Sequence, residues 1–330
     1  MATLYITEQN AWVRKTSDRL IIEKEDQVLA EIPCTKLETV FVFGNVQVTT
    51  QALAELLDHG IELALFTLSG RLRGQLTPPK AKNVELRMRQ YERARDEAFA
   101  LDLARSIVGA KVANSIAVLR RFRENHPEAI CPAEVAELEA SALAVEKVES
   151  LSSLLGIEGS AAARYFPLLA RMVPLEQRPA RRERRPPPDP LNALLSFGYV
   201  LAGSELQALL DGMGFDPYIG FYHQLDYGRP SLALDLLEEF RAPLVDRLSA
   251  TLLNRGQLQA SDFTRNPEGG VRLTKEALKT YFRAWEQTLT EPLVLGEEKL
   301  SYRHLFRRQV ERLARAVRGE ESYEGFRLPC

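Results

Sequence analysis

The residues of this sequence whose types and spacing could carry chemistry lie between positions 217 and 241. Asp235 comes three residues before Glu238 and four before Glu239 in a stretch of helical periodicity, so the three carboxylates can share one helix face. Such a like-charge cluster lowers stability unless a positive group lies against it. His223 precedes the stretch in a loop, and an imidazole near clustered carboxylates suits a divalent cation with open positions for water. The pattern indicates a metal-dependent reaction on a phosphodiester.

One more acid, Glu158, could contribute to such a site from a distant part of the chain. It lies between Gly156 and Gly159 in the segment GIEGSAAARYF, where we expect a break over residues 156–159 and a helix that resumes at Ser160. One interpretation is a carboxylate that interacts with the positive N-terminal end of a helix dipole. The other is a metal ligand at a close-packed helix junction, because glycines let another backbone approach.

Each candidate also has a purely structural interpretation. His223 follows the apolar residues 219–222, and a histidine beside aromatic residues is more often a partly buried side chain than a ligand. Adjacent acids are usually a solvated helix face, although Leu232, Leu236 and Phe240 give this helix a wide apolar surface that favours a crevice beside the acids. The sequence has no Walker, GxSxG, HExxH or GxGxxG motif, which argues against nucleotide hydrolysis, a serine triad and a zincin.

Composition restricts the class of protein further. With 330 residues, of which 45% are hydrophobic and 27% charged, the chain is long enough for two domains of ordinary soluble character. The net charge of −2 argues against a uniformly basic nucleic-acid binder, so DNA binding would need local patches. Cys34, Cys131 and Cys330 never show CxxC spacing, which predicts a reducing cytoplasm and no thiolate metal site. Neither a signal peptide nor a membrane span is expected.

Arginine-rich segments supply candidates for such patches. Residues 161–185 hold seven Arg or Lys against two acids, and residues 178–190 are either a solvated linker or an arm that binds DNA phosphates in a salt-sensitive way. Further arginines cluster just past residue 80: Arg87, Arg89, Arg93 and Arg95. Others lie along the last expected helix, whose pattern also fits an ordinary docked helix: Arg303, Arg307, Arg308, Arg312 and Arg315.

The elements that must position these residues change character near position 80. Before it we expect strands over residues 4–7, 11–15, 19–23, 28–32, 40–43, 46–49, 61–67 and 72–76. One helix interrupts them, over residues 51–59, with Thr50 as its N-cap and Gly60 as its left-handed end. After it we expect helices over residues 98–123, 133–155, 160–172, 191–210, 231–254, 274–289 and 300–317, with Ser231 as an N-cap.

The expected fold is therefore α+β. Residues 1–80 form a small β-rich N-terminal domain, residues 81–97 a linker and first helical segment, and residues 98–330 a larger all-α catalytic domain.

Several of these segments together resemble a known family. GIEGSAAARYF, followed some sixty residues later by DPYIGFYHQLDYGRPSLALDLLEEFRAPLVDR, is similar to the CRISPR-associated spacer-acquisition integrase, protein one of that system. VFVFGNVQVTTQALAELLDHGIELALF and IVGAKVANS support the resemblance, which covers nearly the whole chain. It implies the two-domain fold above, a homodimer that pairs through its N-terminal domains, and two such dimers bridged by the small ferredoxin-like CRISPR-associated protein two. An end-trimming nuclease partner, the CRISPR subtype, the repeat sequence and the role of residues 178–190 stay open.

The resemblance also assigns roles by position. It implies Glu158, His223 and Glu238 as ligands of Mg²⁺ or Mn²⁺, Asp235 as an additional acid beside the metal, and Glu239 as a neighbour. Mixed oxygen and nitrogen ligation fits Mn²⁺ at least as well as Mg²⁺. The implied activity is that of a cytoplasmic DNA integrase and endonuclease, in which a 3′-hydroxyl of a captured fragment attacks a phosphodiester of the double-stranded CRISPR repeat. The alternatives are a stand-alone nuclease for branched DNA and a non-catalytic DNA-binding scaffold.

Overall fold

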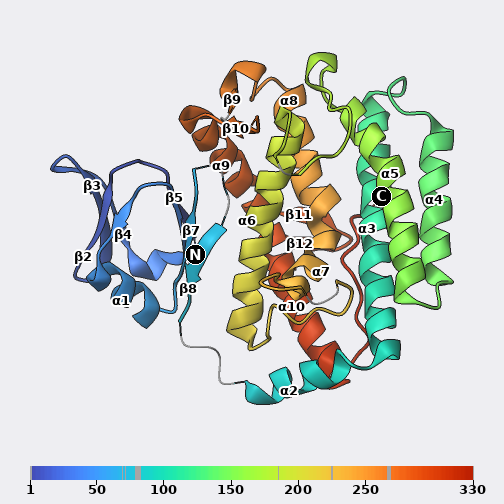
Figure 1. The fold of residues 1–330 in the computed structure, drawn as a ribbon, viewed down its shortest axis with the longest axis horizontal. Helices are drawn as coiled ribbons and strands as arrows, with labels where there is room; N and C mark the ends of the chain where they lie inside the picture. The colour runs from blue at the N-terminus through green and yellow to red at the C-terminus, as the bar shows by residue number, and fades with distance from the viewer. Residues whose placement is uncertain are drawn as a thin grey trace. The chain divides into compact units, whose positions relative to one another are not determined.

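The computed structural model describes residues 2–68, 70, 72–78, 83–184, 186–223, 226–265 and 269–329. The chain divides into two compact units, Met1–Lys80 and Ala81–Cys330. The first is rich in strands and the second is mainly helical (Figure 1), so the predicted α+β class is confirmed.

Two four-stranded sheets make up the described part of the first unit. One has the order β1-β5-β7-β8, with β1, β5 and β7 parallel and β8 antiparallel to β7. The other has the order β4-β3-β2-β6, an antiparallel meander with β6 parallel to β2 at one edge. The strands are β1 Ala2–Ile6, β2 Trp12–Thr16, β3 Arg19–Lys24, β4 Gln27–Pro33, β5 Leu37–Phe43, β6 Gln47–Val48, β7 Glu62–Phe66 and β8 Leu72–Leu76.

A single described helix, α1 (Thr50–Asp58), packs into the core of this unit through Ala52 and Leu56. Its N-cap is Thr49, whose hydroxyl accepts a hydrogen bond from the Ala52 backbone N–H at 3.3 Å, so the predicted cap at Thr50 is wrong by one residue. Gly60 has a φ of +72°, which confirms the predicted left-handed end.

Helices build the second unit, and two short hairpins lie between them, so the prediction that residues 98–330 are all-α is wrong there. The helices are α2 Val84–Arg93, α3 Glu97–Asn125, α4 Pro132–Glu146, α5 Leu151–Arg171, α6 Pro190–Met213, α7 Ser231–Phe240, α8 Arg247–Asn254, α9 Lys275–Thr290 and α10 Tyr302–Arg318. Short helical turns occur at Cys34–Lys36 in the first unit and at Leu175–Gln177 and Ala260–Asp262 in the second. The hairpins pair β9 Phe263–Arg265 with β10 Val271–Leu273, and β11 Leu293–Leu295 with β12 Glu298–Leu300.

The central helix of this unit is α3, which packs against α4, α5 and α7. Its fully buried Asn114 donates hydrogen bonds to the backbone oxygens of Glu239 (2.7 Å) and Phe326 (2.8 Å), and so fixes α3 against α7 and the C-terminal segment. These contacts hold in place the turn of α3 that precedes Asn114.

Helix α5 differs from its prediction. It runs without a break from Leu151 through Gly156 and Gly159, and its N-cap is Ser150, whose hydroxyl accepts a hydrogen bond from the Ser153 backbone N–H. A Cβ on either glycine would meet no atom within 4 Å, so no other backbone approaches there. An exposed glycine weakens a helix by only about 1 kcal/mol, less than the apolar face of α5 gains by packing on α3 and α4. The predicted helix start at Ser160 is therefore wrong.

The predicted helix over residues 231–254 is also not uniform. A π-helical turn, Arg241–Asp246, with Pro243 inside it, separates α7 from α8. Proline lacks the N–H that would continue the α-helical pattern, which explains the wider turn. The N-cap of α7 is Pro230 and Ser231 is its first residue, so the predicted N-cap at Ser231 is wrong by one residue.

Among the described helices, α6 is the one that is long and apolar enough to cross a membrane. Of its most apolar window, 67% is buried inside the unit, as expected for a core helix.

Candidate metal centre

Two carboxylates from different helices contact one ammonium group in the second unit. Lys111 Nζ on α3 forms an ion pair with Glu158 Oε1 on α5 and another, at 2.7 Å, with Glu238 Oε2 on α7. The side chains of Lys111 and Glu158 are 17% and 20% exposed and that of Glu238 only 5%, so the contact lies at the rim of the interior. Because α3 packs against both α5 and α7, it brings together two acids that are far apart in the sequence.

The imidazole of His223 lies beside Glu238. Its Nε2 is 3.8 Å from Glu238 Oε1, and its Nδ1 is 2.7 Å from Asp235 Oδ1. A carboxylate can only accept there, so Nδ1 carries a proton, and Nε2 is the ring nitrogen nearest to Glu238. The two candidate ligands His223 and Glu238 are therefore neighbours.

Asp235 does not face the same space but holds the loop that carries His223. Its fully buried carboxylate accepts backbone N–H groups of Phe221 (2.7 Å), Tyr222 (3.1 Å) and His223 (2.8 Å). A Cβ at Gly220 would come within 2.8 Å of Asp235 Oδ2, so only glycine leaves room for this arrangement. Asp235 thus orients the histidine, which is the usual task of a carboxylate behind a ligating imidazole.

Glu238 stays ionised in spite of its burial. Burial by itself would raise the pKa of its carboxyl group, but Arg241, Lys111 and His223 outweigh it and lower the pKa to about 2. Arg241 Nε is 2.9 Å from Glu238 Oε2, and its guanidinium group stacks 4.3 Å from the centre of the Tyr199 ring. Arg241 follows Glu238 by three residues, a spacing that could have marked it as a partner.

Glu239 points elsewhere, although it is adjacent to Glu238 in the sequence. Its buried carboxylate accepts hydrogen bonds from Tyr323 Oη (2.5 Å), Gln309 Nε2 (2.8 Å) and the Phe326 backbone N–H (2.7 Å). Successive residues of a helix point about 100° apart, so the prediction that all three acids share one face is wrong for Glu239.

Comparison with known proteins places the chain in a family. A family model described as CRISPR associated protein Cas1 matches residues 4–287. The CRISPR-associated endonuclease Cas1 3 of Thermus thermophilus is 35% identical in an alignment of 332 positions that covers 99% of this chain and 97% of that protein. The chain belongs to the Cas1 family.

Other Cas1 relatives and structures extend the comparison. A CRISPR-associated exonuclease Cas4/endonuclease Cas1 fusion of Geobacter sulfurreducens is 38% identical over 96% of this chain, which spans 58% of the length of the fusion. The structure of a Cas1 protein from Thermotoga maritima, 26% identical, superposes with a TM-score of 0.86 over 99% of this chain and 100% of that one. A casposase bound to integration product has a TM-score of 0.87 over 100% of this chain and 96% of its own, and at 22% identity it shows the shared fold.

The donor set of this Cas1 family site fits a divalent cation. Two carboxylates share one monovalent ammonium group, and an imidazole lies beside one of these carboxylates. Within the described residues, no three of Glu158, His223, Asp235 and Glu238 have ligand atoms all within 4.8 Å of one another. The Tyr222 hydroxyl is buried beside them and has no hydrogen-bond partner in the described part of the chain. Burial and the nearby carboxylates raise its pKa, so it stays a neutral donor. Displacement of Lys111 would let the three ligands close around one ion.

Several arginines of the arginine-rich segments form hydrogen bonds or ion pairs within the fold. Arg182 donates hydrogen bonds to Asn192 Oδ1 (2.8 Å) and Ser196 Oγ (3.2 Å), so this part of residues 178–190 packs on α6 and is no solvated linker. Residue 185 lies outside the described residues. Along α10, the arginines form ion pairs with carboxylates, as expected for a docked helix: Arg303 with Glu286 (2.8 Å), Arg308 with Glu298 (2.5 Å) and Arg315 with Glu321 (2.9 Å).

Proposed function

We propose that this Cas1 family protein is a metal-dependent DNA integrase and endonuclease of CRISPR adaptation. The observation that supports the proposal is that Glu158 and Glu238 share one ammonium group, that of Lys111, and that His223 lies beside Glu238. Relatives that match almost the whole chain bear the name CRISPR-associated endonuclease, and the casposase with the same fold was solved with an integration product.

Glu158, His223 and Glu238 would hold Mg²⁺ or Mn²⁺. When bound, such an ion neutralises charge on the scissile phosphate and lowers the pKa of the attacking hydroxyl group. The mixture of two oxygen ligands and one nitrogen ligand favours Mn²⁺ at least as much as Mg²⁺.

The residues around the ligands keep them in the required states. Asp235 keeps the His223 proton on Nδ1, so that Nε2 can ligate. Arg241 keeps Glu238 ionised and fixes its orientation. Lys111 holds the two glutamates together before an ion enters, and its flexible side chain can then turn toward a DNA phosphate.

The reaction is a transesterification. The oxygen of a free 3′-hydroxyl group of the captured fragment bonds to a phosphorus of the repeat. The bond from that phosphorus to the 3′-oxygen of the repeat strand breaks, and the proton of the attacking group passes through solvent to the leaving oxygen. With water as the attacking group, the same site nicks the strand.

The proposal includes partners. Double-stranded DNA enters as both fragment and repeat, and residues 1–80 pair two copies of the chain in a cytoplasmic homodimer. The small CRISPR-associated protein two would bridge such dimers: a solved Cas6-RT-Cas1–Cas2 complex contains a chain 26% identical to this one, with a TM-score of 0.85, of which this chain covers 36%. The relative fused to Cas4 favours an end-trimming nuclease as a further partner.

A strand-transfer assay tests the function. A labelled DNA fragment with free 3′-hydroxyl groups is incubated with a repeat-bearing plasmid, with the small partner protein, and with Mn²⁺ or EDTA. We expect joined strands with Mn²⁺ and none with EDTA, and loss of joining in Glu158→Ala and His223→Ala while DNA binding persists. Glu149→Ala, at an exposed acid just before α5, is the matched control and should join normally.

Each other result selects an alternative. Cut strands without joined strands would identify a stand-alone nuclease. Metal-independent DNA binding without cutting or joining would identify a scaffold. Normal joining by both the Glu158 and the His223 variants would refute the assigned site.

A further inference from the structure

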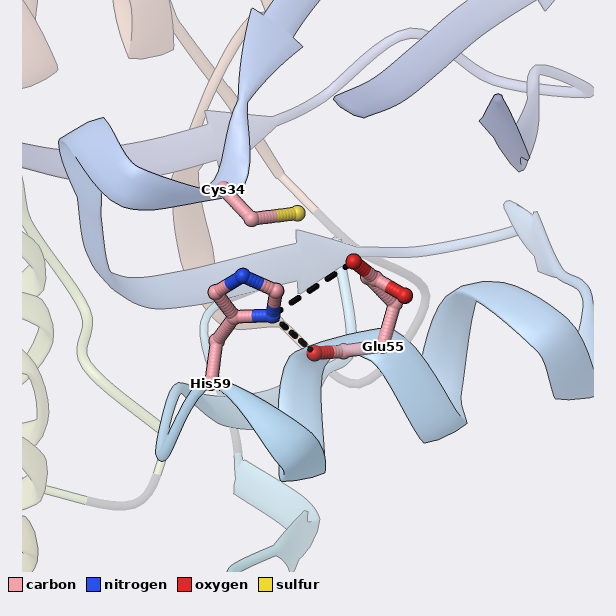
Figure 2. Close-up of side chains that lie close together, drawn as sticks. All are labelled: Cys34, Glu55 and His59. Carbon is pink, nitrogen blue, oxygen red and sulfur yellow. Dashed lines mark hydrogen bonds and ion pairs between the residues drawn. The ribbon is translucent and has the colours of Figure 1, made fainter. Parts of the chain in front are cut away.

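A second cluster of metal-binding side chains lies in the first unit. Cys34 opens the short turn Cys34–Lys36 after β4, Glu55 lies on α1, and His59 is the residue that ends α1. One potential ligand atom from each of the three residues lies within 4.8 Å of the other two. Figure 2 shows the three side chains facing one another across the gap between this turn and α1.

The backbone fixes this arrangement. Glu55 and His59 are four residues apart and so lie on the same face of α1, the spacing by which helices supply pairs of zinc ligands. Cys34 belongs to the same core cluster as Ala52 and Leu56 of α1, and these packed side chains set its distance from the helix. The site is therefore largely formed before any ion binds.

The surroundings of Glu55 match those of a ligating carboxylate. Lys15 Nζ, from β2, pairs with Glu55 Oε2, whereas His59 Nδ1 lies 3.5 Å from Oε1 and 3.0 Å from the Glu55 carbonyl oxygen. An ion bound through Oε1 would leave the Lys15 pair intact, and that pair would hold the carboxylate as outer partners of metal ligands usually do. Cys34 and Glu55 are buried, and His59 borders solvent, which leaves a way in for an ion.

We propose that Cys34, Glu55 and His59 bind one zinc ion. A thiolate, an imidazole and a carboxylate are the donor set of zinc, while Mg²⁺ and Mn²⁺ prefer oxygen ligands. A zinc–sulfur bond forms as the Cys34 thiol loses its proton to solvent, and no electron is transferred. The fourth position faces solvent beside His59 and takes a water. The ion ties the end of α1 to the turn between β4 and β5. This proposal replaces the prediction, made from the absence of CxxC spacing, that the chain has no thiolate metal site.

The test measures zinc on the full-length protein in the Glu158→Ala/His223→Ala background, which removes the candidate site of the second unit. After chelator treatment, the protein is dialysed against Zn²⁺ alone and the retained zinc is measured by mass spectrometry. We expect one zinc per chain, and a loss of affinity of at least about tenfold in both Cys34→Ser and His59→Ala. Cys131→Ser, at an exposed free cysteine, is the matched control and should retain the zinc.

Co²⁺ gives an independent readout. The protein loaded with Co²⁺ should show a thiolate-to-cobalt charge-transfer band that Cys34→Ser lacks and Cys131→Ser keeps. Because Cys34 is buried, its variant could fail to fold, whereas His59 ends a helix at the surface and its variant keeps the test decisive. Absence of retained zinc, or retention that neither variant weakens, would overturn the proposal. The outcome is independent of strand transfer, so it does not depend on the function proposed above.

Discussion

Replacement of Lys111 by methionine removes the ammonium group that lies between Glu158 and Glu238 and keeps the length of the side chain. In the described part of the chain, Lys111 is the one ion-pair partner of Glu158, while Glu238 keeps Arg241. Without metal, the variant holds two neighbouring carboxylates with one counter-charge fewer. With a divalent ion, the missing charge is supplied again.

The size of the effect follows from burial. Removal of one partner from a buried ion pair costs about 3–5 kcal/mol. Glu158 is 20% exposed and Glu238 retains a second cation. We therefore expect the substitution to lower the free energy of unfolding, measured without metal, by about 3 kcal/mol, near the lower limit. A metal present at about 100 times its dissociation constant raises the free energy of unfolding of the variant by about 2.7 kcal/mol. The ion no longer has to displace Lys111, so its affinity should rise at least about tenfold, or about 1.4 kcal/mol.

Urea unfolding with EDTA and with Mn²⁺, together with calorimetric titration of Mn²⁺, measures both quantities. Lys147→Met, at an exposed lysine that ends α4, is the matched control and should change neither. The reasoning is refuted if Lys111→Met loses the same stability in both conditions and binds Mn²⁺ no more tightly than the unchanged protein. Lys111 would then have no place at the metal position.

Three further substitutions test the surroundings of the site. Asp235→Asn should weaken Mn²⁺ binding about 10- to 100-fold in a calorimetric titration, because the amide no longer fixes the His223 proton on Nδ1; unchanged binding would contradict this role. Gly220→Ala should lower the melting temperature, since its Cβ would come within 2.8 Å of Asp235 Oδ2, and an unchanged melting curve would show that the loop has room. Burial raises the pKa of Glu239 from 4.5 to about 7, so its contribution to stability is complete below pH 4.5 and is lost as the pH rises to about 7. Between pH 5 and pH 8, urea unfolding should show that the free energy of unfolding falls by roughly 3 kcal/mol less in Glu239→Gln than in the unchanged protein. Parallel pH profiles of the two proteins would contradict the raised pKa of Glu239.

Periodicity predicted most of the fold because it is a local property of the chain. Apolar residues of α3 such as Val112, Ile116 and Leu119 recur at helical spacing, so its prediction over residues 98–123 missed the ends by only one and two residues. The break predicted at Gly156 failed because packing of α5 on α3 and α4 outweighs a weak local preference.

The candidate site was predicted only in part, for a similar reason. Glu158, His223 and Glu238 were predicted as ligands from motifs, and the structure places Glu158 and Glu238 on one ammonium group and His223 beside Glu238. Lys111 was missed because one lysine in a long helix has no pattern of its own, and its partners lie on helices distant in sequence. The cluster of Cys34 with Glu55 and His59 was missed because only Glu55 and His59 share a short spacing, and tertiary packing brings Cys34 to them.

Anomalous diffraction from a crystal grown with Mn²⁺ tests the central claim most directly. We predict one manganese peak about 2.0–2.2 Å from Nε2 of His223 and from a carboxylate oxygen of each of Glu158 and Glu238, with Lys111 turned away. A crystal with Mn²⁺ in excess that shows no peak there, and Lys111 still between the two glutamates, would contradict it.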